Sequence, residues 1–188
     1  MNLPNKLSLI RILMVPLTVA FFYMTFIPYN YVICATVFAI ASFTDFLDGY
    51  IARKYNLVTD LGKFLDSIAD KVLVLAVLTV MLTNPCVFAG TFGFTFGALM
   101  GGIGVTIIVA RELVVCFLRM IAAGKGKVLA AENVGKIKTF ATDFAMLFLL
   151  VAVHFPVLYI PGIVLFIISV ALTVYSGIYY LVKNRDVF

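Results

Sequence analysis

Three long stretches of this 188-residue chain contain no aspartate, glutamate, lysine or arginine. They cover residues 12–44, 72–110 and 144–182, and are 33, 39 and 39 residues long. A 39-residue helix would be roughly 58 Å long, whereas the hydrocarbon core of a bilayer is about 30 Å thick. Each stretch is therefore too long for one membrane-spanning helix and has the right length for two.

Each charge-free stretch also has residues near its middle that end or turn helices. They lie at residues 28–31, at residues 83–85 with Gly90, and at residues 154–156 with Pro161-Gly162. The pattern predicts an all-α, polytopic membrane protein with six transmembrane helices arranged as three hairpins. Residues 1–188 then form a single membrane domain, because no length remains for a second, soluble one.

Composition excludes the main alternatives to a membrane protein. Apolar residues make up 64% of the chain and charged residues 12%, whereas a soluble domain is about half apolar and a quarter charged. A disordered chain is excluded for the same reason. Three cysteines, Cys34, Cys86 and Cys116, form no motif, and we expect unpaired, apolar side chains rather than a disulfide framework.

The 14 lysines and arginines lie away from the three midpoint turns, and the formal net charge is +5. The positive-inside rule makes their side of the membrane cytoplasmic. The sequence therefore predicts a multi-pass protein of the cell (plasma) membrane with both termini and its charged face in the cytoplasm. The positive charge then reports topology and contact with membrane lipids, and nucleic acid is not an expected partner.

Four aspartates lie near the predicted cytoplasmic ends of two neighbouring helices. Asp45 and Asp48 end the second predicted helix, and Asp66 and Asp70 open the third. Residues three or four apart share a helix face, so each pair lies on one side of its helix. Because the connection between the helices is short, the two faces can oppose each other and bring four carboxylates into one cleft.

Divalent cations would make such a cleft favourable. An aspartate at the centre of a membrane helix costs roughly 2.5–3.5 kcal/mol on insertion scales, and neighbouring carboxylates repel one another. Hard carboxylate oxygens suit Mg²⁺ or Mn²⁺, and paired metal ions serve in-line displacement at phosphorus. We therefore expect two Mg²⁺ or Mn²⁺ ions at Asp45, Asp48, Asp66 and Asp70. The alternative is a set of interfacial aspartates balanced by nearby cations.

The aspartates belong to a longer motif, in which small residues share their stripes. The chain reads Asp45-x-x-Asp48-Gly49-x-x-Ala52-Arg53, eight further residues, then Gly62-x-x-x-Asp66-x-x-x-Asp70. This motif resembles the complete signature of the CDP-alcohol phosphotransferase family, with all eight positions filled at the family's spacing. Within the family, the chain is similar to the bacterial phosphatidylglycerophosphate synthases in its N-terminal segment around Asn5 and around residues 110–112, 118–119 and 135–139. Ser67 departs from that subfamily, which usually has proline there.

The resemblance implies a reaction in which CDP-diacylglycerol and glycerol 3-phosphate give phosphatidylglycerophosphate and CMP. It implies that the four aspartates hold the metal ions and that Asp70 is also the general base for the acceptor hydroxyl. It further implies a homodimer. The CDP site that it implies consists of Asn5, Asp48, Gly49, Ala52, Arg53 and Gly62.

The acceptor phosphate calls for a basic pocket. The candidates are Arg111, Arg119, Lys136 and Lys138, with Glu112 as a residue that could orient one of them. The alternative for each cation is a flanking charge of the positive-inside type. The sequence offers no functional account of Asp143, which lies in an otherwise apolar helix. Gly93, Gly97 and Gly101 recur every four residues, a spacing that permits close helix packing within one chain or across a dimer.

Three other functions compete with this interpretation. A sister enzyme of the family would use another acceptor, such as serine or inositol phosphate. A membrane prenyltransferase also holds Mg²⁺-diphosphate on paired aspartate motifs, but such proteins are usually longer and lack the glycine and alanine register. A non-enzymatic cation carrier would place its acids near the bilayer midplane, whereas these aspartates lie at helix ends.

Overall fold

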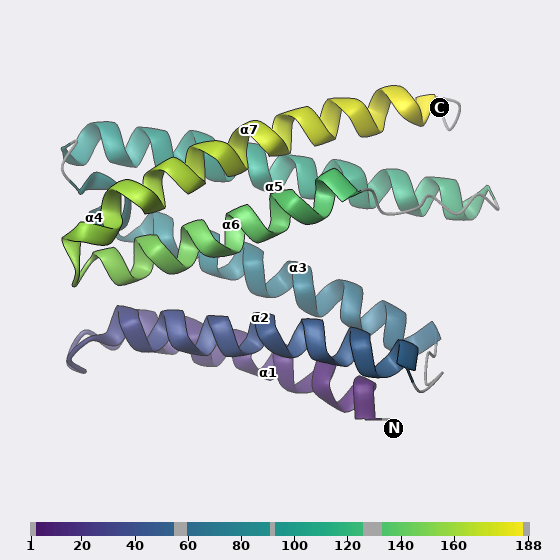
Figure 1. Ribbon diagram of the computed structural model, residues 1–188, viewed down its shortest axis with the longest axis horizontal. Coiled ribbons are helices and arrows are strands. Elements are labelled where there is room, and N and C mark those ends of the chain that lie inside the picture. The colour runs from purple at the N-terminus through teal and green to yellow at the C-terminus, as the bar shows by residue number, and fades with distance from the viewer. Residues whose placement is uncertain (1–2, 55–59, 91–92, 126–132, 186–188) are drawn as a thin grey trace.

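The computed structural model describes residues 3–54, 60–90, 93–125 and 133–185, and all regular structure in these ranges is helical. Six long helices lie alongside one another (Figure 1). In chain order the elements are α1 (Leu3–Tyr23), α2 (Asn30–Lys54), α3 (Asp60–Thr83), α4 (Cys86–Ala89), α5 (Phe94–Gly124), α6 (Asn133–Ala152), the 3₁₀ turn η1 (Pro156–Leu158) and α7 (Tyr159–Lys183). The all-α prediction is confirmed, and the long helices break near the three predicted midpoints.

The first hairpin consists of α1 and α2, which pack against each other along their length. Its turn contains Tyr29 with φ +58°, a left-handed conformation that is uncommon outside glycine. The side-chain amide of Asn30 donates a hydrogen bond to the backbone oxygen of Phe22 at 2.9 Å. This bond satisfies a carbonyl near the end of α1 that has no partner within the helix, and so fixes the point where α2 begins.

The last hairpin consists of α6 and α7, the most extensively packed pair of helices. Gly162 makes the close crossing possible, because a Cβ atom there would lie only 3.1 Å from the Cδ2 atom of Leu149. Pro161 was expected at a helix end, and it lies in the first turn of α7. Proline is tolerated there because the first N–H groups of a helix have no intrahelical partner.

The middle pair of long helices, α3 and α5, pack less against each other than the two helices of either hairpin do. α3 packs chiefly against α1, and α5 packs chiefly against α7. The short helix α4 lies between them and packs on α5, where Cβ atoms at Gly97 and Gly101 would meet Phe88 at 2.3 and 2.6 Å. These glycines therefore serve packing within the chain, and they give no support to a dimer face at this stripe.

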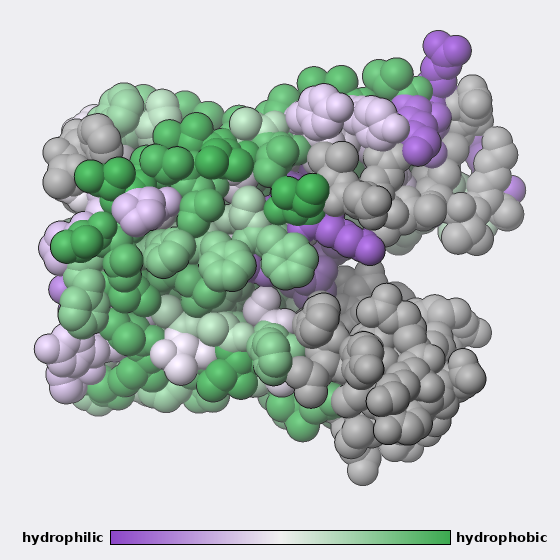
Figure 2. Space-filling view, viewed as in Figure 1, coloured by the Kyte–Doolittle hydropathy of each residue, from purple (hydrophilic) through white to green (hydrophobic). Residues whose placement is uncertain are grey.

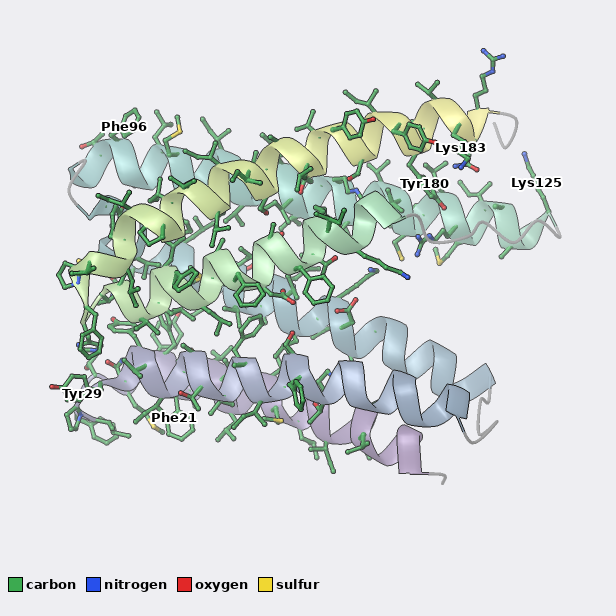
Figure 3. All side chains as sticks on the ribbon, viewed as in Figure 1. Phe21, Tyr29, Phe96, Lys125, Tyr180 and Lys183 are labelled. Carbon is green, nitrogen blue, oxygen red and sulfur yellow. The ribbon has the colours of Figure 1, made fainter. Side chains whose placement is uncertain are left out.

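The chain ends marked N and C lie at one end of the bundle, where α2 and α5 also end and α3 and α6 begin (Figure 1). The α1–α2 turn, α4 and η1 lie at the opposite end. Lys125 and Lys183 mark the first end and Tyr29 the second in Figure 3. These labelled lysines thus lie at the end of the bundle where α7 ends, as the charge pattern predicts.

The outer surface is rich in large apolar side chains on every long helix, for example Leu13, Phe43, Phe117, Phe140 and Ile167. Figure 2 shows this apolar surface extending over much of one face. Within the described residues, one helix is long and apolar enough to cross a membrane, Pro156–Lys183, and only 28% of its most apolar window is buried inside the protein. Two shorter apolar helices are Leu7–Tyr23 and Asn30–Thr44.

Candidate active site

The signature aspartates lie on two consecutive helices at the end of the bundle that carries the termini. Asp45 and Asp48 belong to the last turns of α2, and Asp66 and Asp70 to the first turns of α3. Lys54 ends α2 and Asp60 begins α3, so the two helix ends are separated by at most about 22 Å of chain. The backbone therefore keeps both aspartate pairs near one connection, as the sequence predicts.

Several side chains of the motif lie outside the described residues. The side chains that lie outside the described residues are those of Asn5, Asp45, Asp48, Ala52, Arg53 and Asp66, and the surroundings of Gly49 are likewise outside them. Among the side chains that are described, no group of three histidine, cysteine or acidic residues has the arrangement of a metal site. The donor set itself, four carboxylates on adjoining helix ends, fits a hard divalent cation. Asp70 and Gly62 are partly buried.

A cavity of about 680 Å³ opens beside Asp70 and is enclosed by α3, α5, α6 and α7. Its volume is that of a small-molecule site. All four cations that the sequence proposes for the acceptor phosphate line it. The charged residues in its wall are Asp70, Lys71, Arg111, Glu112, Arg119, Lys136 and Lys138. The cavity thus joins the last aspartate of the motif to a strongly basic surface.

Glu112 is the centre of an ion cluster that joins three helices across this cavity. Its carboxylate accepts hydrogen bonds from Lys71 of α3 at 3.3 Å and from Arg111 of α5 at 3.0 Å. Lys138 of α6 donates to the same oxygen, Oε1, as Arg111. The side chains of Glu112 and Arg111 are each 14% exposed, and that of Lys138 is 5% exposed. Low exposure strengthens the Coulomb attraction within the cluster, and removing one partner would leave a buried, uncompensated charge.

Arg111 retains hydrogen-bonding capacity beyond this cluster. Its Nε atom is buried and has no hydrogen-bond partner among the described residues. Buried guanidinium nitrogens are normally paired, and a phosphate oxygen is a suitable acceptor for one. Arg111 therefore has a free donor in a cavity that already holds several cations.

The last helix supplies a wall of the cavity that sequence reasoning did not identify. Ser176 and Tyr180 of α7 line it, and the Nε atom of Arg119 donates a hydrogen bond to the Tyr180 hydroxyl at 3.2 Å. Figure 3 shows Tyr180 near the polar end of α7. Lys71 was also missed, although it directly follows the motif. None of these three residues carries a sequence signal, because their roles come from contacts between distant segments.

Asp143 also has a structural context that its sequence does not reveal. Its Oδ2 atom accepts a hydrogen bond from the hydroxyl of Ser42 at 3.1 Å. Ser42 lies on α2, one turn before Asp45. The bond thus links α6 to the helix that carries the first pair of motif aspartates.

Comparison with known proteins agrees with this architecture. The family model described as CDP-alcohol phosphatidyltransferase matches residues 1–175. The chain therefore belongs to the CDP-alcohol phosphatidyltransferase family, and the expected family resemblance is confirmed. Membership sets aside the prenyltransferase and cation-carrier alternatives.

Several curated relatives resemble the chain over nearly its whole length. The CDP-diacylglycerol–glycerol-3-phosphate 3-phosphatidyltransferase of Bacillus subtilis is 38% identical, and the alignment covers 98% of this chain and 96% of the relative. The proteins of the same name from Salmonella typhimurium and Shigella flexneri are 35% and 34% identical, and each alignment covers 98% of this chain and 95% of the relative.

Proposed function

We propose that this protein transfers the phosphatidyl group of CDP-diacylglycerol to glycerol 3-phosphate, releasing CMP and forming phosphatidylglycerophosphate. The observation that carries the proposal is the single cavity shared by Asp70 and four basic side chains, Arg111, Arg119, Lys136 and Lys138. The relatives whose names specify this reaction support it, because they match almost the entire chain. A phosphorylated acceptor suits this cavity better than serine, which carries no phosphate.

The acceptor phosphate binds among the cations of the cavity. Arg111 offers a buried Nε donor to one phosphate oxygen, and Lys138 and Arg119 add positive charge from α6 and α5. Arginine forms directional, charge-assisted hydrogen bonds with phosphate. Holding the phosphate in this way would orient the acceptor hydroxyl toward the motif aspartates, and such positioning contributes much of the rate in phosphoryl transfer.

Asp70 accepts the proton of the attacking hydroxyl. The hydroxyl oxygen forms a new bond to the phosphorus that carries the diacylglycerol, the bond from that phosphorus to the bridging oxygen breaks, and CMP leaves with that oxygen. A carboxylate within reach of the hydroxyl contributes typically 10²–10⁴-fold as a general base. Asp70 suits this role because it belongs to the motif and also lines the acceptor cavity.

The nucleotide end of the donor belongs at the adjoining ends of α2 and α3. Asn5, Asp48, Gly49, Ala52, Arg53 and Gly62 form the proposed CDP site, in which small residues leave room for the substrate. Asp45, Asp48, Asp66 and Asp70 would hold two Mg²⁺ or Mn²⁺ ions. Bound there, such ions supply Lewis-acid stabilisation of the diphosphate charge.

The six long helices are proposed to span the cell membrane, with both termini and the active site facing the cytoplasm. The support is the apolar outer surface, the charge-free stretches and the presence of both termini at one end of the bundle. This position suits the substrates, because the acyl chains of CDP-diacylglycerol remain in lipid while its nucleotide and the acceptor come from water.

Release of CMP by purified protein in detergent tests the proposed reaction. CDP-diacylglycerol and Mg²⁺ are supplied with glycerol 3-phosphate, serine, inositol phosphate or no acceptor. We expect release with glycerol 3-phosphate alone. Release with inositol phosphate or serine instead would retain the family assignment and contradict the proposed acceptor, and release without any acceptor would indicate hydrolysis.

A further inference from the structure

Helix α7 contributes a wall to the acceptor cavity, and this wall is distant in sequence from the aspartate motif of α2 and α3. The α7 residues at the cavity are Ser176 and Tyr180. Gly177, between them, is buried. Family members share the donor motif, so residues that discriminate among acceptors are expected elsewhere in the site. The α7 wall has the position that such residues require.

Tyr180 holds one of the cavity arginines by two contacts. Its hydroxyl accepts a hydrogen bond from Nε of Arg119 at 3.2 Å, and its ring lies 5.6 Å from the guanidinium carbon. Tyr180 is itself 2% exposed and packs against Val115 and Leu118 of α5. A buried tyrosine with a rigid ring and few rotatable bonds therefore fixes the direction of a long, flexible cation.

Gly177 sets the space available to a second arginine. A Cβ atom at this position would lie 3.1 Å from Cγ of Arg111, closer than ordinary van der Waals contact. The arginine side chain would have to move by a few tenths of an ångström to accommodate it. The absence of a side chain at Gly177 thus allows Arg111 to occupy its observed position beside Glu112.

We propose that Tyr180 and Gly177 are positioning residues that set the specificity of this enzyme for a phosphomonoester acceptor. Tyr180 directs Arg119, and Gly177 leaves the space that Arg111 requires, so that both guanidinium groups converge on one phosphate. This inference rests on the proposed function, because it assumes that the cavity receives the acceptor phosphate. Each residue acts through an arginine, Tyr180 through Arg119 and Gly177 through Arg111.

Tyr180→Phe tests the first half of this proposal, and Tyr179→Phe is its matched control. The control residue is adjacent and 43% exposed, and it lies under Lys183 rather than in the cavity. A hydrogen bond to a charged group is lost only in Tyr180→Phe, so we expect its KM for glycerol 3-phosphate to rise about tenfold. Its kcat and its KM for CDP-diacylglycerol should stay within about twofold of wild type, as expected for lost uniform binding.

Inorganic phosphate provides a binding measurement that does not depend on turnover of the acceptor. As a competitive inhibitor against glycerol 3-phosphate, it should bind Tyr180→Phe more weakly by the same factor as the change in KM. A merely structural role for the tyrosine would instead lower kcat and raise both KM values together. That result, or a Tyr180→Phe variant indistinguishable from Tyr179→Phe, would overturn the proposal.

Gly177→Ala tests the second half, with Gly102→Ala as control. Gly102 lies on α5, and a Cβ atom there would meet nothing within 4 Å. We expect the KM for glycerol 3-phosphate to rise several-fold in Gly177→Ala and to stay unchanged in Gly102→Ala. Unchanged kinetics in Gly177→Ala would overturn the role of this glycine. Failure of the wild-type protein to use glycerol 3-phosphate would instead refute the proposed function, so the two failures are distinguishable.

Discussion

Replacing Glu112 by glutamine should weaken acceptor binding and destabilise the protein together. The substitution keeps the size of the side chain and removes its charge. Arg111 and Lys138 both bind Oε1 of Glu112, so their charged groups lie within about 6 Å of each other, the combined length of two ordinary ion pairs. At an effective dielectric constant of about 20, two like charges at that distance repel by about 3 kcal/mol.

Without the carboxylate this repulsion is uncompensated, and the cations separate. Removing one partner of a buried ion pair typically costs about 3–5 kcal/mol, in agreement with the Coulomb value. Since each 1.4 kcal/mol is a factor of ten, a loss of about 3 kcal/mol that fell wholly on acceptor binding would raise the KM for glycerol 3-phosphate about a hundredfold. Part of the loss falls on the stability of the protein instead, so we expect a rise of about tenfold to a hundredfold. The temperature at which the detergent-solubilised protein loses activity should fall as well.

The assay is CMP release at varied glycerol 3-phosphate with saturating CDP-diacylglycerol, for wild type, Glu112→Gln and Glu112→Asp. The aspartate variant keeps the negative charge and should recover part of the lost affinity. The KM for CDP-diacylglycerol serves as internal control and should change little. A Glu112→Gln variant with wild-type acceptor KM and wild-type thermal stability would refute the view that Glu112 holds the cavity cations together.

Four further outcomes are expected. Asp70→Asn should lower kcat by about 10²–10⁴-fold without abolishing binding of the acceptor, and a fully active variant would exclude Asp70 as the base. Chelation of divalent cations should stop CMP release, and Mg²⁺ or Mn²⁺ should restore it. Gly97→Ala should destabilise the protein by about 1–3 kcal/mol through a clash with the backbone of α4, measured by thermal inactivation, whereas Gly102→Ala should not. In intact cells, a membrane-impermeant maleimide should label Cys86, which is exposed, and should not label Cys116. Labelling of Cys116 alone would contradict the proposed topology.

The sequence predicted the helices well because helix length and breaks depend on local features. Charge-free stretches and turn residues gave six long helices, and the structure has them. Pro161 indicated the start of the last helix closely, because proline is tolerated in a first helical turn and α7 begins two residues earlier, at Tyr159. The short helix α4 was not predicted, since it is stabilised by packing on α5 rather than by its own length.

The candidate site was predictable to different degrees on its two sides. The aspartate motif is continuous across α2 and α3, so its spacing alone placed it at one connection. The four cations that the sequence proposed for the acceptor do line one cavity. The sequence also named Glu112 as a residue that could orient one of them, and Arg111 and Lys138 both donate to it. It did not show that Glu112 joins α3, α5 and α6, or that Tyr180 approaches Arg119 from 61 residues away. Such contacts depend on how helices pack, which no local pattern encodes.

The most direct test of the account follows the acceptor rather than the leaving group. Purified protein in detergent receives CDP-diacylglycerol, Mg²⁺ and glycerol 3-phosphate labelled in its phosphate, and label in the organic phase is compared with CMP in the aqueous phase. We predict one labelled phosphate transferred into lipid for each CMP released, with Tyr180→Phe and Glu112→Gln requiring more acceptor for the same rate. CMP release without labelled lipid would contradict the proposed transfer.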